Sequence, residues 1–289
     1  MVYKTKTWEL KTNPIQLNQD SIIINRDNSV AIPTYTLQSL DLITLDYEVR
    51  QKIKEKWLTA SEKNPKLRPG LKYKLISAKY GGPAIIMHLN LGITDYGVFV
   101  GTNSAAREDP EFAKYLMDKG KEFYNNEFVY FASPVGNCGI VESSDNRIAL
   151  IKRAHDLHEY PGWYDTPGGH ANPLKHSFDS KGQFDAIKDE VSEEIKIPRE
   201  SIEESYLIGI TANLENFRKP DLLFYLRTGL DSNKMDPNEE VSGLERLTND
   251  ELFEHWRKGT YKIVPPSQAL LFAYFSLQQG YDLSFLENK

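Results

Sequence analysis

The sequence contains a single cysteine, Cys138, among its 289 residues. An intramolecular disulfide is therefore excluded, and a reducing compartment is expected, with Cys138 as a small buried residue. The chain also lacks any apolar run of the length that a membrane-spanning helix needs. Its first residues, MVYKTKTWELK, show no apolar core of a secretory signal. We therefore expect a cytoplasmic protein, with the nucleus as the alternative, that does not associate with a membrane.

An excess of positive charge is absent as well. Lys and Arg number 35 against 41 Asp and Glu, so the formal net charge is −6. Double-stranded nucleic acid binds proteins through its phosphates, which requires a basic stripe or patch. The acidic balance disfavours that class of partner. A small anionic ligand stays open, because a bound metal ion can supply positive charge locally.

Enough apolar material is present for a substantial core. Hydrophobic residues make up 40% of the chain, a fraction typical of globular domains, and the length fits one large or two smaller domains. No Gly/Ser-rich linker marks a boundary, but the pattern of elements changes near residue 127. We predict an N-terminal α+β domain over residues 1–127 and a second domain of the α/β class over residues 128–289.

An acidic segment, DEVSEEIKIP at residues 189–198, stands out in the second half. In a helix over about 184–196, Glu190, Glu193 and Glu194 share one face because they are spaced i, i+3, i+4. The apolar residues form a separate stripe: Phe184, Ile187, Val191 and Ile195. Three carboxylates on a rigid element suit a hard divalent cation such as Mg²⁺. An ordinary solvated acidic face is the alternative.

The stretch TPGGH, residues 166–170, precedes this helix. Gly168 and Gly169 allow a close approach of the backbone to a ligand, so their backbone groups can face a diphosphate or offer a carbonyl to a metal ion. A plain turn is the alternative for a Gly-Gly pair taken alone. A strand, a Pro-Gly-Gly turn and a glutamate-faced helix in succession are more specific than either half.

Together these segments resemble the Nudix hydrolases. The box of that family reads Gly, five residues, Glu, seven residues, then Arg-Glu-U-x-Glu-Glu-x-Gly-U, where U is a bulky aliphatic residue. The segment DEVSEEIKI supplies Glu190, Val191, Glu193, Glu194 and Ile197 at the matching positions. The resemblance implies an α/β/α sandwich built on a mixed sheet, preceded here by an N-terminal α+β extension.

The box departs from the family pattern at four points. Asp189 stands where the family has Arg, Lys196 replaces the box glycine, and the isolated Glu falls near Lys181. The gap from Gly169 to Asp189 is longer than in the family, which implies an inserted loop over residues 172–182. The three glutamates that the family uses as metal ligands remain, which favours an active enzyme. A catalytically inactive nucleotide-binding module is the alternative.

Further stretches resemble the UDP-glucose and UDP-galactose hydrolase branch of the family: NPKLRPGLKYKLISA, GITDYGVFVGTN and PVGNCG. That branch has an N-terminal extension and a lengthened box without the Arg. The resemblance implies hydrolysis of the diphosphate of UDP-sugars to UMP and sugar 1-phosphate, with Mg²⁺ as cofactor and Mn²⁺ as the alternative. The partner is then a nucleotide-sugar substrate, and the protein a monomer or homodimer. A Nudix activity on coenzyme A or ADP-ribose is the competing prediction.

The resemblance also assigns site residues. Glu190, Glu193 and Glu194 are the expected catalytic metal ligands, and the carbonyl of Gly169 is a further ligand. A catalytic acid outside the box is expected from the loop PNEEVSG, where Glu240 is preferred, with a solvated loop acid as the alternative.

Substrate contacts are expected from polar side chains near the box and in the extension. An Arg fork matches phosphate geometry, while aromatic, hydroxyl and amide groups can hold the base, ribose or sugar. The predicted substrate-binding residues are Arg153, Tyr96, Thr102, Asn103, Gly168, Asn213 and Arg218. A surface charge is the alternative for Arg153, and a turn with a core aromatic residue is the alternative for residues 96–103.

Overall fold

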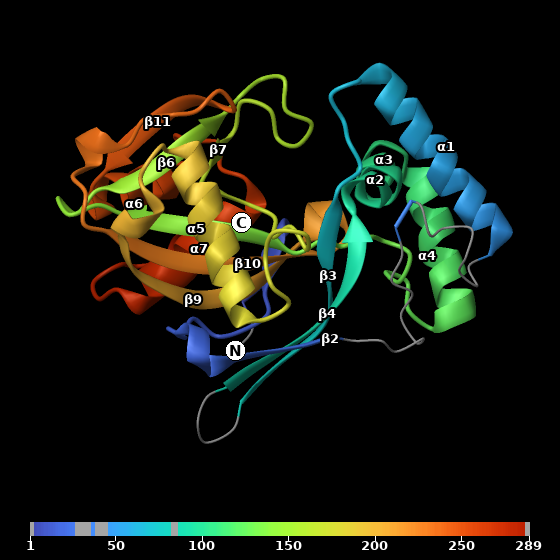
Figure 1. The fold of residues 1–289 in the computed structure, drawn as a ribbon, viewed down its shortest axis with the longest axis horizontal. Helices are drawn as coiled ribbons and strands as arrows, with labels where there is room; N and C mark the ends of the chain where they lie inside the picture. Colours follow the sequence, from blue (N-terminus) through green and yellow to red (C-terminus); the bar gives the residue numbers. More distant parts are fainter. Residues whose placement is uncertain (1–2, 27–35, 38–45, 82–85, 287–289) are drawn as a thin grey trace.

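The computed structural model describes residues 3–26, 36–37, 46–81 and 86–286. A larger mixed sheet covered by helices lies beside a smaller sheet that carries its own helices (Figure 1). Helices and strands alternate through the second half of the chain. The predicted α/β class is confirmed.

The larger sheet runs in the order β1-β9-β10-β5-β6-β11. Its strands are β1 (Trp8–Leu10), β5 (Gly136–Glu142), β6 (Ile148–Arg153), β9 (Ile202–Asn213), β10 (Lys219–Thr228) and β11 (Val241–Leu247). Two short strands join it: β7 (Tyr164–Asp165) pairs with β6, and β8 (Gly168–Gly169) pairs with β5. The pair β10–β5 is parallel and the other pairs are antiparallel, so the sheet is mixed.

Helices cover both faces of this sheet. Helix α5 (Ser180–Glu194) packs on one face, and α6 (Asn249–Lys258) and α7 (Pro265–Leu277) pack on the other (Figure 1). Leu222 of β10 belongs to the core under α5, whereas Leu223 belongs to the core under α7, because successive side chains of a strand point to opposite faces. The result is the three-layered α/β/α arrangement that the resemblance implied.

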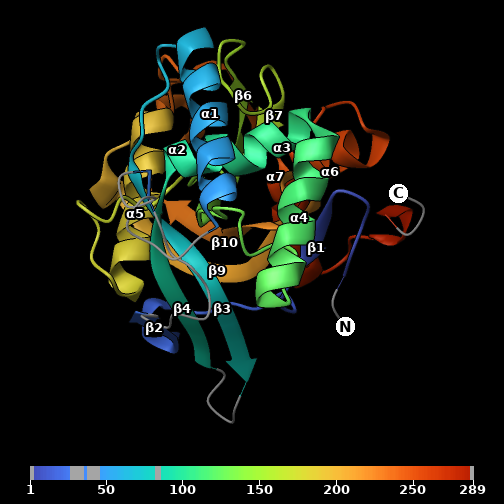
Figure 2. The ribbon, with the colours of Figure 1, turned by 90° about the vertical axis from the view of Figure 1, so that its right-hand side faces the viewer.

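The smaller sheet has the order β2-β4-β3, with β2 (Ile22–Arg26), β3 (Leu71–Gly81) and β4 (Ile86–Asp95). Strands β3 and β4 pair antiparallel. The accompanying helices are α1 (Tyr47–Lys63), α2 (Tyr96–Phe99), α3 (Ala105–Glu108) and α4 (Pro110–Tyr124), with a π-turn over Val100–Ser104. Figure 2 shows α1 and α4 on the side away from the larger sheet.

The start of the chain crosses the division proposed at residue 127. Strand β1 pairs antiparallel with β9, with Leu10 opposite Thr211. Farther along, the backbone of Leu17 exchanges hydrogen bonds with that of Leu207 at 2.9 Å. The first residues therefore belong to the larger sheet, and the division at 127 stays a prediction for the remainder.

Helix α5 begins and ends for identifiable local reasons. Its N-cap is Asp179, whose side chain accepts a hydrogen bond from the Gly182 N–H at 2.8 Å, and the last helical residue is Glu194. Two positions later Lys196 adopts a left-handed conformation with φ of 50°. This is the place where the Nudix box has glycine, which adopts such a conformation without strain. The predicted apolar stripe is buried on the sheet: Phe184, Ile187, Val191 and Ile195.

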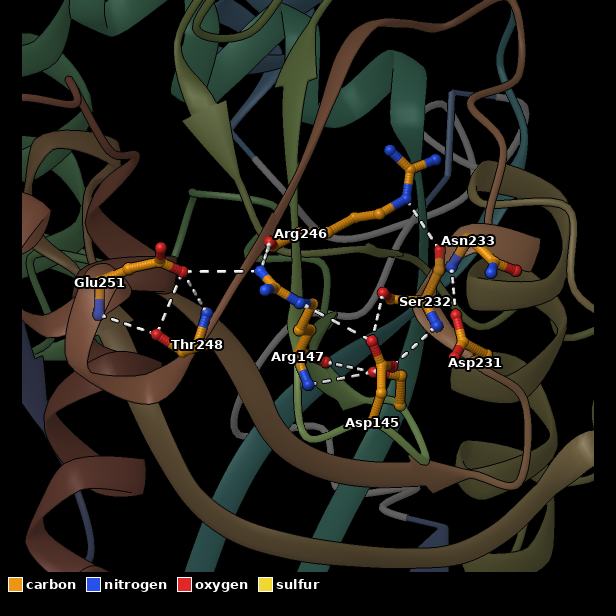
Figure 3. Close-up of polar contacts among 9 residues, drawn as sticks. Asp145, Arg147, Asp231, Ser232, Asn233, Arg246, Thr248 and Glu251 are labelled. Atoms are coloured by element: carbon orange, nitrogen blue, oxygen red, sulfur yellow. Dashed lines mark hydrogen bonds and ion pairs between the residues drawn. The ribbon is translucent and has the colours of Figure 1, made fainter.

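A polar cluster lies where the turn between β5 and β6 meets the segment between β10 and β11 (Figure 3). The carboxylate of Asp145, in the predicted turn between β5 and β6, accepts hydrogen bonds from the N–H and Oγ of Ser232, both at 2.8 Å. The same side chain accepts from Ser143 Oγ at 2.5 Å. Nearby, Thr248 and Glu251 form the capping box of α6, as their spacing predicts. The turn is thereby tied to the segment between β10 and β11.

In the part of the chain that the structure describes, no helix combines the length and apolar character needed to cross a bilayer.

Candidate functional site

A cavity of about 300 Å³ opens where the Gly168–Gly169 strand, helix α5 and strand β3 of the smaller sheet meet. It lies over one end of the β5–β10 pair of the larger sheet. Charged and polar side chains line most of its wall. The predicted residues that line it are Tyr96, Arg153, Gly168, Gly169, Glu190, Glu194, Asn213 and Glu240.

The glycine turn and the acidic helix touch directly. The backbone N–H of Gly168 donates a hydrogen bond to Glu194 Oε2 at 2.7 Å. A Cβ atom placed on Gly169 would lie 2.4 Å from the carboxyl carbon of Glu190. A side chain at position 169 would therefore have to displace the Glu190 carboxyl. The combination that the sequence singled out comes together as one structural unit.

Burial perturbs both carboxyls of this unit. The pKa of Glu194 is raised well above its ordinary value, mainly by burial and also by the charges of Asp165 and Glu190, although the Gly168 N–H opposes the shift. Burial likewise raises the pKa of Glu190, against the opposing charge of Lys72. Two acids held close together at a low local dielectric favour the approach of a cation. The oxygen donors are those that Mg²⁺ prefers.

Glu193 is near enough to Glu190 for its charge to help raise the pKa of that carboxyl, but it does not share the cavity wall. Its side chain is exposed and does not line the cavity. Among the described residues, no group of three His, Cys, Asp or Glu side chains is gathered closely enough to hold a metal ion. The structure thus brings two of the three predicted carboxylates to the turn, beside the backbone of Gly169. The role of Glu193 as a ligand stays a prediction.

Arg153, at the end of β6, is held in place from two sides. Its Nε donates to the carbonyl of Glu159 at 3.0 Å, and its Nη1 donates to Asp165 Oδ2 at 2.9 Å. Asp165 also accepts from Ser267 Oγ at 2.5 Å. These bonds fix the guanidinium at the cavity wall, where its remaining N–H groups can meet an anion.

Tyr96 and Asn213 reach the cavity from opposite sheets. Burial raises the pKa of Tyr96 and keeps its hydroxyl protonated at neutral pH. Asn213 Nδ2 donates to the hydroxyl of Tyr160 at 3.0 Å, and Tyr160 itself adopts a left-handed φ of 48°. Glu240 is exposed and stands at the rim, directly before β11. These positions are compatible with the predicted contacts, which remain untested.

Three predicted substrate-binding residues lie elsewhere. Thr102 and Asn103 are fully buried; Thr102 Oγ1 donates to the Val98 carbonyl at 2.7 Å, and Asn103 Nδ2 donates to the Asn216 carbonyl at 3.0 Å. Their polar groups thus hold the protein's own backbone. Arg218 donates to Glu9 Oε2 at 2.8 Å and lines a separate cavity. The geometry gives these three no contact with the cavity beside the box.

Sequence reasoning missed several residues that line the cavity. These are Lys72, Asn137, Glu159, Asp165, His170, Lys219 and Asp221. Lys219 Nζ and Asp221 Oδ1 form a buried ion pair at 2.8 Å, and Asp221 raises the pKa of this lysine despite its burial. Three of them lie in stretches that the sequence analysis singled out without giving them a role: Lys72 in NPKLRPGLKYKLISA, Asn137 in PVGNCG and His170 in TPGGH. The other four lie outside these stretches.

The charge reversal at Asp189 has a structural explanation. Arg199 Nη1 donates to Asp189 Oδ1 at 2.8 Å, and His176 Nε2 hydrogen-bonds Asp189 Oδ2 at 3.1 Å. His176 lies in the predicted inserted loop, and its carbonyl accepts from the hydroxyl of Tyr73 at 2.8 Å. The aspartate therefore anchors the insertion to α5 and to the smaller sheet. An arginine at position 189 could not make this contact, because its positive charge would repel Arg199.

The cavity has more negative than positive side chains. Among the described residues that line it, the carboxyl groups are Glu159, Asp165, Glu190, Glu194, Asp221 and Glu240, and the cationic groups are Lys72, Arg153 and Lys219. Asp165 and Asp221 neutralise two of these three cations. An anionic ligand would meet net repulsion here unless it arrived with a cation.

Comparison with known proteins adds sequence relatives. "Nudix hydrolase 9" of Arabidopsis thaliana is 30% identical over 211 residues, covering 63% of this chain and 64% of the relative. "Uridine diphosphate glucose pyrophosphatase NUDT22" is 27% identical in Homo sapiens, over 68% of this chain and 69% of the relative. The mouse protein of the same name is 25% identical, over 62% and 61%. The chain thus spans less than two thirds of the length of the first relative.

No family model matches the sequence. Among solved structures, a Nudix hydrolase from Alicyclobacillus acidocaldarius is 13% identical with a TM-score of 0.39, covering 48% of this chain and 89% of that one. The assignment therefore rests on the sequence relatives together with the turn-and-helix unit described above. On those grounds the chain is similar to Nudix hydrolases.

Proposed function

We propose that this protein hydrolyses the diphosphate of UDP-sugars, such as UDP-glucose and UDP-galactose, to UMP and sugar 1-phosphate. The observation that carries the proposal is the contact between the Gly168–Gly169 turn and Glu190 and Glu194 in one cavity. Support for the substrate class comes from relatives named uridine diphosphate glucose pyrophosphatase. The similarity to a relative named Nudix hydrolase supports the reaction class.

The charge of the cavity supports a requirement for Mg²⁺, with Mn²⁺ as the alternative. A diphosphate brings further negative charge to a wall that already has an excess of carboxyls. Glu190, Glu194 and the carbonyl of Gly169 offer the oxygen donors that would hold the ion. When bound, such an ion would neutralise the diphosphate and lower the pKa of a coordinated water. Glu193 would have to change its exposed position to take part.

The side chains of the chain itself have distinct roles in this proposal. Arg153, fixed by Asp165 and by the Glu159 carbonyl, orients a phosphoryl group through its remaining N–H donors. Tyr96 and Asn213 hold the nucleoside or the sugar. These assignments give the N-terminal extension a part in substrate binding, since Tyr96 lies directly after β4 of the smaller sheet.

The chemical step is a displacement at phosphorus. A water oxygen forms a bond to one phosphorus, and the bond between that phosphorus and the bridging oxygen breaks. The bridging oxygen leaves with the other phosphoryl group, so both products are monophosphates. Glu240, exposed at the rim of the cavity, accepts the proton that the water loses.

The test is a substrate panel with the purified protein. UDP-glucose, UDP-galactose, ADP-ribose and coenzyme A are incubated with Mg²⁺ or EDTA, and the nucleotide products are separated by anion exchange. We expect UMP from both UDP-sugars, abolished by EDTA, and a loss on the order of 10²-fold for Glu194→Gln. Glu239→Gln, an exposed neighbour outside the cavity, serves as the matched control.

Two results would reject the proposal. Cleavage of ADP-ribose or coenzyme A without cleavage of UDP-sugars would assign a different Nudix activity. Absence of turnover for every compound, with equal UDP binding by the wild type and Glu194→Gln, would assign a nucleotide-binding module. The proposal also includes a cytoplasmic location and a monomer or homodimer; the single buried Cys138 agrees with a reducing compartment.

A further inference from the structure

Lys72 differs from the other cations of the cavity. Arg153 and Lys219 are engaged by Asp165 and Asp221 at 2.9 and 2.8 Å. Within residues 3–26, 36–37, 46–81 and 86–286, the side chain of Lys72 makes no hydrogen bond or ion pair, although it lines the same cavity. Its ammonium group is therefore the positive charge that an incoming ligand can use.

The surroundings of Lys72 penalise its charge in the free protein. Burial lowers the pKa of Lys72, and the positive charge of Lys219 lowers it further, while Glu190 acts in the opposite direction. The ammonium group loses hydration on burial, and the charge of Glu190 compensates only part of that loss. An anion bound beside it would recover that loss.

Asn137 is a second unsatisfied group on the same wall. Its side chain is 1% exposed, and neither Nδ2 nor Oδ1 has a hydrogen-bond partner within the described residues. A buried polar atom without a hydrogen bond lowers stability by about 1–3 kcal/mol. A buried side-chain amide without hydrogen bonds at a cavity wall therefore indicates that a binding partner is absent. Asn137 lies on β5 directly opposite Gly169, next to the glycine turn.

The strand that carries Lys72 is anchored at the next residue. The Val135 N–H donates to the Tyr73 carbonyl at 2.8 Å, and the Tyr73 hydroxyl donates to the His176 carbonyl at 2.8 Å. Strand β3 is thus fixed both to the segment that enters β5 and to the inserted loop. A side chain on such a strand is held in position relative to the larger sheet, as a binding group requires.

We propose that Lys72 and Asn137 together bind one phosphoryl group of the substrate, with Lys72 as the fixed cation and Asn137 Nδ2 as a neutral donor to a phosphoryl oxygen. This inference rests on the proposed function and deepens it. It makes the smaller sheet a source of a substrate-positioning residue. It also places the phosphoryl group between β3 and β5, beside Gly169.

The experiment measures diphosphate binding rather than turnover alone. The affinities of UDP and of inorganic pyrophosphate are determined by calorimetry, with EDTA and with Mg²⁺, over a range of NaCl concentrations. The variants are Lys72→Met, Lys72→Arg, Asn137→Leu and Asn137→Asp. Lys79→Met, an exposed lysine of the same strand outside the cavity, is the matched control, and circular dichroism verifies that each variant is folded.

Loss of a hydrogen bond to a charged group weakens binding by about 10- to 100-fold. We expect this loss of UDP and pyrophosphate affinity in Lys72→Met and Asn137→Asp, with a flatter dependence on salt in Lys72→Met. Lys72→Arg should retain most of the affinity because the charge remains, and Asn137→Leu should lie between Asn137→Asp and the wild type. If UDP-sugars are cleaved, KM should rise more than kcat falls.

Affinity changes below about threefold in folded Lys72→Met and Asn137→Asp would overturn the inference, whatever the protein hydrolyses. An effect of Lys79→Met as large as that of Lys72→Met would also overturn it. Conversely, absence of UDP-sugar cleavage together with the expected loss of pyrophosphate binding would reject the proposed function and leave this inference standing. The two failures are therefore distinguishable.

Discussion

Replacement of Asp145 by asparagine tests how strongly the turn between β5 and β6 is bound to the segment between β10 and β11. The carboxylate accepts from Ser143 Oγ at 2.5 Å and from the N–H and Oγ of Ser232 at 2.8 Å (Figure 3). These bonds lower the pKa of Asp145 from 3.8 to about 2, with the Ser143 hydroxyl as the largest cause. Asp145→Asn keeps one acceptor oxygen and replaces the other with an NH₂ group that cannot accept.

The magnitude follows from the pKa. The fall from 3.8 to about 2 corresponds to roughly 2 kcal/mol of preferential stabilisation of the charged form. Because the Asp145 side chain keeps 31% of its exposure, solvent screening reduces the measurable part to about 1 kcal/mol. We therefore expect Asp145→Asn to lower the free energy of unfolding at pH 7 by about 1 kcal/mol.

The sign of the pH dependence is fixed. The folded-state pKa of Asp145 lies below the unfolded value, so its stabilisation is complete above 3.8 and is lost as the pH falls from 3.8 through about 2. Urea denaturation followed by tryptophan fluorescence gives the free energy of unfolding at neutral pH and at steps toward pH 3. The difference between wild type and variant should shrink below about pH 4.

Asp118→Asn provides the control, because Asp118 forms an exposed pair with Lys114 on a helix surface and should change stability by less than about 0.5 kcal/mol. A variant at Asp145 that is as stable as the wild type at pH 7 would contradict the reasoning. So would a difference that stays constant down to pH 3.

Further predictions concern the box and the core. Gly169→Ala should lower activity on the order of 10²-fold with an unchanged circular dichroism spectrum, since its Cβ would displace the Glu190 carboxyl; unchanged turnover would contradict this. Lys196→Gly should raise the free energy of unfolding by up to about 1 kcal/mol, because φ is 50° there; a loss of stability in urea would show that the lysine has another role. Phe224→Ala, at a fully buried position, should cost about 3–5 kcal/mol, measured in the same way; a loss below 1 kcal/mol would refute the packing described.

Local patterns predicted the central unit of the site well. The apolar stripe of α5 has helical spacing, so its burial and the position of the acidic face followed from the sequence. The Gly-Gly pair was expected to let the backbone approach a ligand; the structure shows a close approach to the Glu190 carboxyl, and the contact with a ligand stays a prediction. Both features depend on neighbours within one or two turns of chain.

The acidic face was described too coarsely. In a helix each residue turns by about 100°, so Glu194 lies about 40° from Glu190, whereas Glu193 lies about 60° away on the other side. Glu190 and Glu194 can therefore both line the cavity wall while Glu193 lies at the edge of the acidic face. The exposed position of Glu193 follows from that geometry.

Contacts between distant segments could not be predicted. Lys72 and Asn137 line the same cavity because β3 of the smaller sheet is anchored beside β5, and the stretches that contain them give no sign of this proximity. Thr102 and Asn103 were expected at the substrate because their stretch resembles the family branch, yet the helical turns around them bury both side chains. The sequence predicts a loop around Glu240, and the structure shows that strand β11 begins at the next residue. This strand could not be predicted because its sequence lacks a clear alternation of polar and apolar residues.

Strand β1 has a consequence for the colloidal behaviour of the protein. By pairing with β9 it occupies backbone groups that would otherwise form an open flank of a long, largely apolar strand. Exposed flanks of this kind recruit strands from other molecules. Three residues near the beginning of the chain thus cover the backbone of Thr211–Asn213 against pairing with strands of other molecules.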